Sequence, residues 1–180
     1  MIYEILFHFV FDYLSFYDKH VFQKINKRML SFEIIDLKNI DHKYLRRIDN
    51  TILNDYKNIK FLDSSFNTNI NNINRFTNLK ELITHINMKD DDIARLNLEV
   101  LNANHTSKIK NINHMSKLRK LSATYECGIN DEGIKHINLC EINISNNMRI
   151  DKDDLKHMEN LTNIIDDYDE YYFMPSKWKY

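Results

Sequence analysis

The sequence has few of the residues that mark sharp turns, crosslinks and reactive sites. Its 180 residues include two glycines, one proline, two cysteines and one tryptophan. Two cysteines are too few for the disulfide framework of a small secreted domain, so we expect a reducing compartment. The glycines form neither a phosphate-binding G-x-x-x-x-G-K-S/T loop nor a G-x-G-x-x-G turn, which excludes the commonest nucleotide-binding motifs.

An excess of charge of one sign is also missing, since 25 Lys and Arg residues stand against 26 Asp and Glu residues. With this balance, the chain lacks the excess of positive charge that attracts nucleic acid or an anionic membrane. The apolar N-terminal run "MIYEILFHFVFDYL" is interrupted by Glu4, His8 and Asp12, and it lacks a basic region and a cleavage site. It is also too short and too charged to span a bilayer. We therefore expect a cytoplasmic monomer that binds neither nucleic acid nor membrane.

What the chain does have is a period of about twenty residues. Six motifs of the type "NLKEL" pair an apolar residue with another three positions later, and a looser copy occupies residues 32–37. The second apolar residues are separated by steps of 20, 19, 20, 21 and 22 residues, and they are Leu62, Leu82, Leu101, Leu121, Ile142 and Ile164. Such spacing is typical of leucine-rich repeats, in which each unit supplies a short strand and a return helix or turn. We expect an α/β solenoid of about seven repeats over residues 32–164.

Each repeat keeps the same internal order. A small or apolar residue follows two positions after the second leucine, and a return segment with helical spacing, such as Ile112 with Met115, closes the unit. Between them lies a turn residue whose side chain can bond to the backbone, and these residues are Asn67, Asn87, Thr106, Cys127 (one residue later than the others) and Asn147. Because stacked turns leave backbone groups without water, we expect these side chains to satisfy them.

Both glycines and both cysteines fall in one stretch, "CGINDEGIKHINLCEI". Cys127, His136 and Cys140 could be read as metal ligands, but their spacing and the lack of a fourth ligand argue against that reading. No G-x-S-x-G elbow or similar catalytic motif is present. We therefore expect no metal, no cofactor and no catalytic residues, and the chain is not expected to be an enzyme.

The same region carries a family resemblance. The sequence "LRKLSATYECGINDEGIKHI" closely resembles the cysteine-containing leucine-rich repeat, whose pattern is L-x-x-L-x-L-x-x-C-x-x-I-T-D-E-G-L-K-x-L. The resemblance implies that Cys127 is a buried thiol in the turn. It also implies that Asp131 and Glu132 begin the return helix, with Gly133 inside its first turn. The chemistry of this stretch is then structural.

The first 31 residues do not follow the repeat. Helical spacing places apolar side chains on more than one side, so such a helix needs more than one partner. The sequence "IYEILFHFVFDYLSFYDKHVFQKINKRML" resembles an F-box, although Tyr3 replaces the usual proline and Met29 the usual tryptophan. The resemblance implies that an F-box-like segment, residues 1–31, docks on a Skp-type adaptor protein. The adaptor-binding residues it implies are Ile2, Ile5, Leu6, Phe9, Tyr13 and Leu14.

Together the two resemblances are to the F-box/leucine-rich-repeat proteins. The composition, rich in Asn, Ile, Lys and Asp, is similar to that of proteins from AT-rich genomes, such as viral or protist ones. The resemblance implies a substrate-recognition subunit of a Skp–cullin–F-box ubiquitin ligase. The alternative is a plain leucine-rich-repeat scaffold whose N-terminal helices cap the open end of the solenoid, as terminal units must.

The substrate-binding surface follows from the alternation of side chains along a strand. Residues on either side of each buried leucine face the concave side, where we expect the unidentified protein substrate to bind. They are Phe61, Asp63, Glu81, Ile83, His85, Val100, Asn102, Lys120, Ser122, Glu141 and Asn143, with Ser65, Asn104, Thr124 and Ser145 further along. An exposed strand face of ordinary composition, without a binding role, is the alternative.

The C-terminal residues 165–180 are aromatic and acidic, then basic, and they hold the only proline and the only tryptophan. We expect them to cap the open edge of the last repeat, because their aromatic side chains are costly to leave in water. A free peptide that binds a partner is the alternative.

Overall fold

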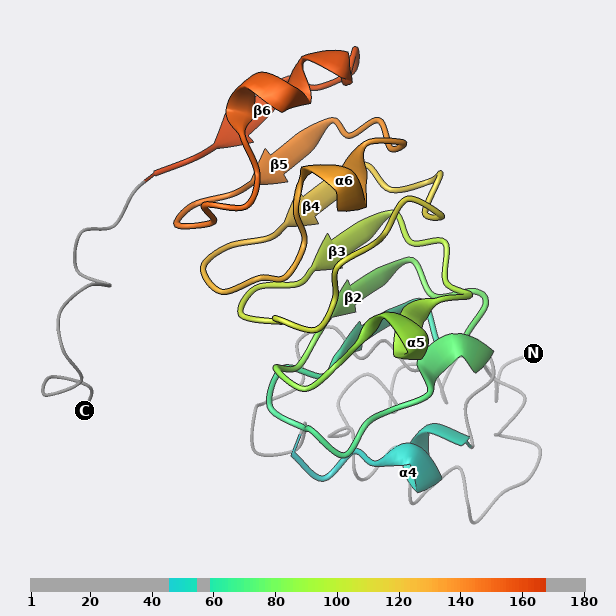
Figure 1. The fold of residues 1–180 in the computed structure, drawn as a ribbon. Helices are drawn as coiled ribbons and strands as arrows, with labels where there is room; N and C mark the ends of the chain where they lie inside the picture. The colour runs from blue at the N-terminus through green and yellow to red at the C-terminus, as the bar shows by residue number, and fades with distance from the viewer. Residues whose placement is uncertain (1–45, 55–58, 168–180) are drawn as a thin grey trace, which may run out of the picture.

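The computed structural model describes residues 46–54 and 59–167 (Figure 1). In this part of the chain, successive coils stack on one another and each coil contributes one three-residue strand. The strands are β1 (Phe61–Asp63), β2 (Glu81–Ile83), β3 (Val100–Asn102), β4 (Lys120–Ser122), β5 (Glu141–Asn143) and β6 (Asn163–Ile165). They form one all-parallel sheet in the order β1-β2-β3-β4-β5-β6, so each strand pairs with the next one along the chain. The fold is α/β with few helices.

The strand register follows the sequence period. The middle residues of the six strands pair in one continuous row, and they are Leu62, Leu82, Leu101, Leu121, Ile142 and Ile164. The first five of them are buried, and Ile164 is partly buried against the same core. Since side chains alternate along a strand, the residues before and after each of them face away from this core. The predicted register of the strands is therefore the one observed.

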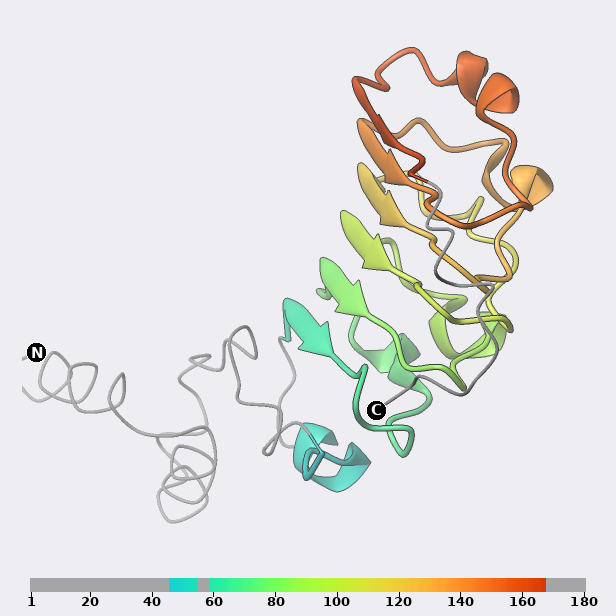
Figure 2. The same cartoon turned by 90° about the vertical axis from the view of Figure 1, so that its left-hand side faces the viewer.

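The return segments are short helices of three to six residues. They are α4 (Asn50–Asn54), η2 (Ile73–Arg75), α5 (Asp90–Ile93), α6 (Asp131–Ile134) and η3 (Lys152–His157). Figure 2 shows α5, α6 and η3 on the side of the stack opposite the strands, and α4 at the lower end of the stack, beneath β1. Each of these helices buries at least one leucine or isoleucine. Ile112 and Met115 form no helix, yet both are buried, and the Met115 N–H donates to the Ile112 carbonyl at 2.9 Å. One backbone turn is enough to bring both side chains inside.

The turns that follow the strands are of two lengths. After β1, β3 and β5 the turn closes early, as where the Asn147 N–H donates to the Ile144 carbonyl at 2.9 Å. After β2 and β4 it closes one residue later, where the Met88 N–H donates to the His85 carbonyl at 3.0 Å and the Cys127 N–H to Thr124 at 3.3 Å. At the residue whose N–H closes the turn, the early turns bury a polar side chain, whereas the late turns bury Met88 and Cys127.

The buried polar side chains of the early turns reach the preceding coil. The Asn147 amide Nδ2 donates to the Ala123 carbonyl at 2.7 Å, and the Asn67 amide donates to the Ile48 carbonyl. Thr106 Oγ1 lies 2.7 Å from Thr84 Oγ1. These bonds satisfy backbone and hydroxyl groups inside the stack, as predicted for Asn67, Thr106 and Asn147. The prediction is wrong for Asn87, which is exposed because its turn closes one residue later.

Two glycines allow neighbouring coils to approach closely around Cys127. A Cβ added to Gly133 would lie 2.0 Å from the Lys110 carbonyl oxygen, and one added to Gly128 would lie 2.3 Å from the Ser107 carbonyl oxygen. Both distances are far inside van der Waals contact, and the obstacle in each case is backbone, which has little freedom to move. The glycines of this stretch are therefore required by packing.

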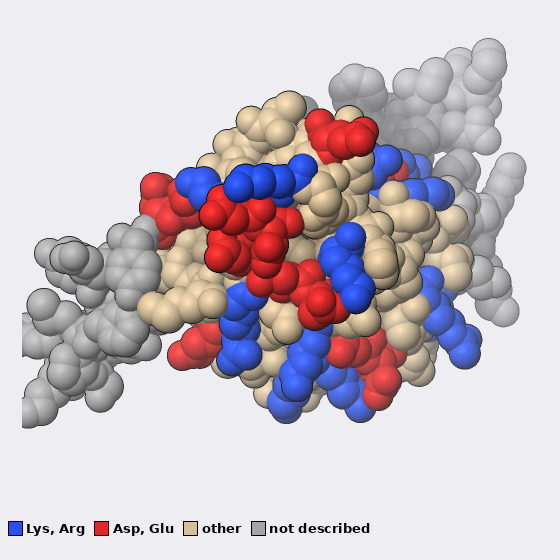
Figure 3. Space-filling model, turned by 45° about the horizontal axis from the view of Figure 1, so that its top comes forward, with Lys and Arg blue, Asp and Glu red and all other residues tan. Residues whose placement is uncertain are grey.

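On the helix side, carboxylates join one coil to the next. Asp90 Oδ1 accepts from the Lys110 N–H at 2.8 Å, and Asp131 Oδ1 accepts from the Asp151 N–H at 2.9 Å. Figure 3 shows a face on which acidic side chains gather in one cluster bordered by basic ones.

Of the helices in the described ranges, none is long and apolar enough to cross a membrane. The F-box-like residues 1–31, the looser repeat at residues 32–37 and the C-terminal residues 168–180 lie outside the described residues.

Candidate functional site

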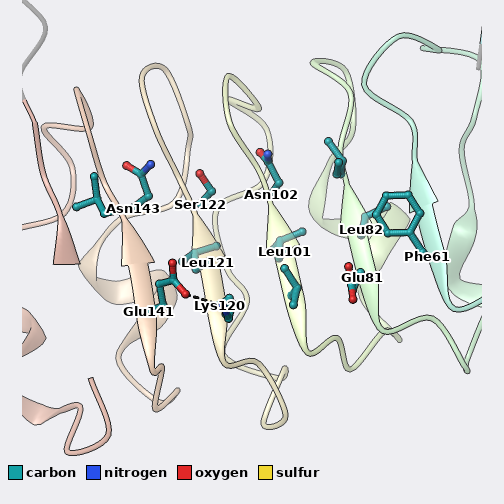
Figure 4. A pocket seen from close by; sticks show the side chains of 13 residues that line it. Phe61, Glu81, Leu82, Leu101, Asn102, Lys120, Leu121, Ser122, Glu141 and Asn143 are labelled. Atoms are coloured by element: carbon teal, nitrogen blue, oxygen red, sulfur yellow. Dashed lines mark ion pairs between the residues drawn. The ribbon is translucent and has the colours of Figure 1, made fainter. Parts of the chain in front are cut away.

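The strand side of the sheet carries a groove of about 480 Å³, which we call the strand groove. All six strands contribute to it (Figure 4). Its lining includes the first or third residues of the strands, namely Phe61, Glu81, Ile83, Val100, Asn102, Lys120, Ser122, Glu141, Asn143 and Ile165. These positions line the groove because the middle residue of each strand points into the core, which leaves its two neighbours on the opposite side.

Nine of the fifteen residues expected on the concave face line this groove, and the other six, Asp63, Ser65, His85, Asn104, Thr124 and Ser145, do not. Asp63 lies at its border, at the end of β1, where its Oδ1 accepts from the Ser65 N–H at 2.9 Å and from the Ser65 hydroxyl at 2.6 Å. Ile165 lines the groove as well, although the sequence period predicts that the last repeat ends at Ile164. The signal was available, since Ile165 occupies the same strand position as Ile83.

The placement expected for His85 is wrong. Its side chain is buried inside the stack, and its Nε2 lies 2.7 Å from the Ile70 carbonyl oxygen. A carbonyl can only accept, so Nε2 carries the hydrogen, and Nδ1 accepts from the Asn87 N–H at 3.2 Å. Thr124, at the same position after β4, is buried too. Both belong to the late-closing turns, which keep one more residue inside before the chain reverses.

The groove is apolar at the end formed by β1, β2 and β3. Phe61, Ile83 and Val100 line it there, and we call these three residues the apolar end. Ile83 and Val100 are half-buried, and Phe61 packs in part against the core. Large apolar side chains that are held in place by a sheet and open on one side are the usual anchors of protein interfaces.

The middle of the groove carries an ion pair between neighbouring strands. Lys120 Nζ lies 2.7 Å from Glu141 Oε2, and Figure 4 shows the pair on β4 and β5. The hydrogen bond and charge of Glu141 raise the pKa of Lys120, and those of Lys120 lower the pKa of Glu141. Both side chains therefore keep their charges around neutral pH. Because the pair is exposed to solvent, its contribution to stability is small. Its main effect is to hold one positive and one negative charge at fixed positions in the middle of the groove.

The strand groove is acidic on balance. Glu81 and Glu141 line it together with Lys120, and Asp63 lies at its border. Ser122 Oγ donates a hydrogen bond to Asn104 Oδ1 at 2.8 Å, and Asn102 Oδ1 accepts one from the Asn104 N–H at 3.1 Å. The groove thus offers apolar contacts at one end, hydrogen-bonding side chains along its length and a negative field. This arrangement suits the binding of an extended, partly apolar and basic segment.

Cys127 lies away from the groove and is fully buried. Burial raises the pKa of its thiol to about 11. A thiol that stays protonated at neutral pH is a poor nucleophile and a poor metal ligand. Within the described ranges, no group of three or more His, Cys, Asp or Glu side chains is arranged to hold a metal ion.

A second surface row was not predicted from the sequence. It lies on the turns after the strands, four positions beyond each central leucine, and includes Phe66, Ile86, His105 and Tyr125. Phe66 is 46% exposed and Ile86 is 56% exposed. The rings of His105 and Tyr125 stack with centroids 4.6 Å apart. Helical and strand periodicity say nothing about turns, so no sequence signal indicated this row.

No protein-family model matches the chain, and a search of curated proteins found none similar to it.

Proposed function

We propose that the chain is a leucine-rich-repeat solenoid that serves as the substrate-recognition subunit of a Skp–cullin–F-box ubiquitin ligase. In this proposal residues 1–31 dock on a Skp-type adaptor, and the strand groove holds a protein substrate. Another component of the ligase transfers ubiquitin, so the chain itself performs no covalent chemistry and needs no cofactor.

The observation that carries the binding half of the proposal is the strand groove. It runs across all six strands and combines the apolar end with polar residues such as Asn102 and Ser122. Interfaces are built in this way, with a few large apolar anchors and a surrounding of hydrogen-bonding groups. A period of about twenty residues, with the central leucines in register, supports the leucine-rich-repeat assignment.

The adaptor half of the proposal depends on the sequence of residues 1–31. Ile2, Ile5 and Leu6 follow the opening of the F-box pattern, and Tyr13 and Leu14 follow the end of its first helix. The repeats provide one apolar partner for this segment, and a Skp-type adaptor provides the second.

Binding to a purified Skp-type adaptor, measured by calorimetry, tests the proposal. The wild-type chain should bind. The double variant Leu6→Asp/Phe9→Asp should not, because it places two unpaired charges in the interface. The matched control is His8→Asp, which adds one negative charge at one of the three polar residues (Glu4, His8 and Asp12) that interrupt the apolar run, and it should leave binding intact. All three proteins should show the same circular dichroism and similar melting temperatures.

One result would leave only the plain scaffold. If residues 1–31 are a cap, the wild-type chain does not bind the adaptor. The double variant then melts at a much lower temperature, because its charges enter the core of the solenoid. Those two observations together would refute the ubiquitin-ligase proposal while preserving a repeat domain that binds proteins through the strand groove.

A further inference from the structure

The strand groove and the C-terminal segment of the same chain have complementary chemistry. The groove offers an apolar end next to the carboxylates of Glu81 and Asp63. The segment that follows the last described residue reads "YDEYYFMPSKWKY". Its acidic residues, Asp169 and Glu170, lie near its start, and the only tryptophan, Trp178, lies between two lysines near its end. An aromatic side chain flanked by positive charges fits an apolar surface flanked by negative ones.

The segment is long enough to reach the apolar end. The described chain ends at Asp167, two residues after Ile165, which itself lines the groove. Neighbouring strands are about 4.8 Å apart, so the four steps from β6 to β2 cover roughly 19 Å. The residues from 168 to Trp178 span up to about 36 Å when extended. The chain can therefore leave β6, reverse its direction and still place Trp178 on the apolar end.

The energetic reason for such a contact is the cost of leaving these side chains in water. Residues 168–180 include four tyrosines, a phenylalanine, a methionine and the tryptophan. An aromatic residue buries about 150–250 Å² when it packs on an apolar surface, and this term dominates many interfaces. Because the segment is tethered, it competes with any other ligand at an effective concentration of about millimolar order.

We propose that residues 168–180 fold back along the strand groove and that Trp178 packs on the apolar end formed by Phe61, Ile83 and Val100. Lys177 and Lys179 then lie near Glu81 and Asp63. The contact itself does not depend on the proposed function. Its consequence does: if the groove binds a substrate, the substrate has to displace the C-terminal segment, so the free protein is held in an inhibited state.

Trp178 is a built-in probe for this contact, since it is the only tryptophan of the chain. In the full-length protein its fluorescence should peak at a shorter wavelength than in a synthetic peptide of residues 168–180. Quenching by acrylamide should be several-fold weaker in the protein than in the peptide. An emission maximum and a quenching constant equal to those of the peptide would overturn the proposal.

Two lysine substitutions locate the contact. Val100→Lys, in the groove, should move the emission and the quenching of Trp178 toward the values of the peptide. The matched control is Ile86→Lys, which makes a similar change on an exposed turn outside the groove and should leave both unchanged. If residues 168–180 cap the last coil instead, Trp178 stays protected in Val100→Lys. That result would overturn the proposal.

A charge exchange tests the contact without changing the apolar surface. Glu81→Lys should weaken the protection of Trp178, because it brings a third positive charge beside Lys177 and Lys179. Adding Lys177→Glu and Lys179→Glu in the same chain should restore it. Failure of the second step would count against the placement. No adaptor or substrate enters any of these measurements, so their outcome is independent of whether the ubiquitin-ligase proposal holds.

Discussion

Replacing Gly133 with alanine tests how closely neighbouring coils pack. Gly133 lies in α6, where alanine would normally be favoured over glycine by about 1 kcal/mol. Here the new Cβ would lie 2.0 Å from the Lys110 carbonyl oxygen, whereas a relaxed carbon–oxygen contact is about 3.3 Å or longer. The two coils therefore have to move apart at this point by about the difference between those two distances, which is more than one ångström.

The separation has a direct cost in hydrogen bonding. The Ile112 N–H donates to the Gly133 carbonyl at 3.0 Å, and this bond crosses the same contact. Overpacking of a close-packed interior costs about 1–3 kcal/mol, and a lost backbone bond costs about 1 kcal/mol more. After subtracting the gain in helix propensity, we expect Gly133→Ala to lower the free energy of unfolding by about 1–3 kcal/mol.

Urea denaturation followed by circular dichroism measures this loss. The control is Glu132→Ala, which introduces the same residue at the neighbouring exposed position of α6 and should leave the midpoint close to that of the wild-type protein. The slope of the transition should be the same in all three proteins, so that a shift in midpoint reports stability. A Gly133→Ala protein as stable as the wild type, or more stable, would show that the coils do not approach as described.

Four further predictions concern the core, the strands and the turns that follow them. Leu121→Ala should lower the free energy of unfolding by about 2–5 kcal/mol, whereas Lys120→Ala should cost little; equal losses in denaturant midpoint would show that the strand register is wrong. Thr124→Val should raise the melting temperature, because Thr124 Oγ1 is buried without a hydrogen-bond partner and its removal recovers about 1 kcal/mol; a lower melting temperature would contradict this. Cys127 should react with a thiol reagent several-fold more slowly than Cys140 in the native protein, since burial raises the pKa of Cys127 from its ordinary value of 9.0 to about 11. Because the unfolded thiol loses its proton first, stability should fall as the pH rises from 9 to 11, and Cys127→Ala should remove that part of the pH dependence.

The strand register could be predicted because it depends on a pattern that the chain repeats. Leu62, Leu82 and Leu101 recur at nearly constant spacing, and parallel stacking of equal coils brings equal positions together. The groove lining follows from the same register, because the side chains of a strand alternate. Burial of Cys127 was predicted for a similar reason, since its turn resembles a known repeat pattern.

The turns were harder to predict, because their closure depends on single hydrogen bonds. Asn87 has the same spacing from its leucine as Asn147, yet its turn closes one residue later and His85 is buried in its place. Nothing in the local sequence separates these two outcomes. The close contact at Gly133 likewise depends on where Lys110 lies in the preceding coil, which is a tertiary fact.

The alternation of early and late turns sets the unit by which such a molecule can lengthen or shorten. Early turns send a polar side chain into the coil before them, as Asn147 does toward Ala123. Loss of a single coil would place two early turns or two late turns next to each other. One of them would then pack on a neighbouring turn of the wrong length. Removing or copying two coils at once keeps the sequence of turns intact. Two coils correspond to the 39 residues from Leu62 to Leu101 or the 41 residues from Leu101 to Ile142. Insertions and deletions in related chains should therefore come in blocks of about forty residues, twice the period of the repeat.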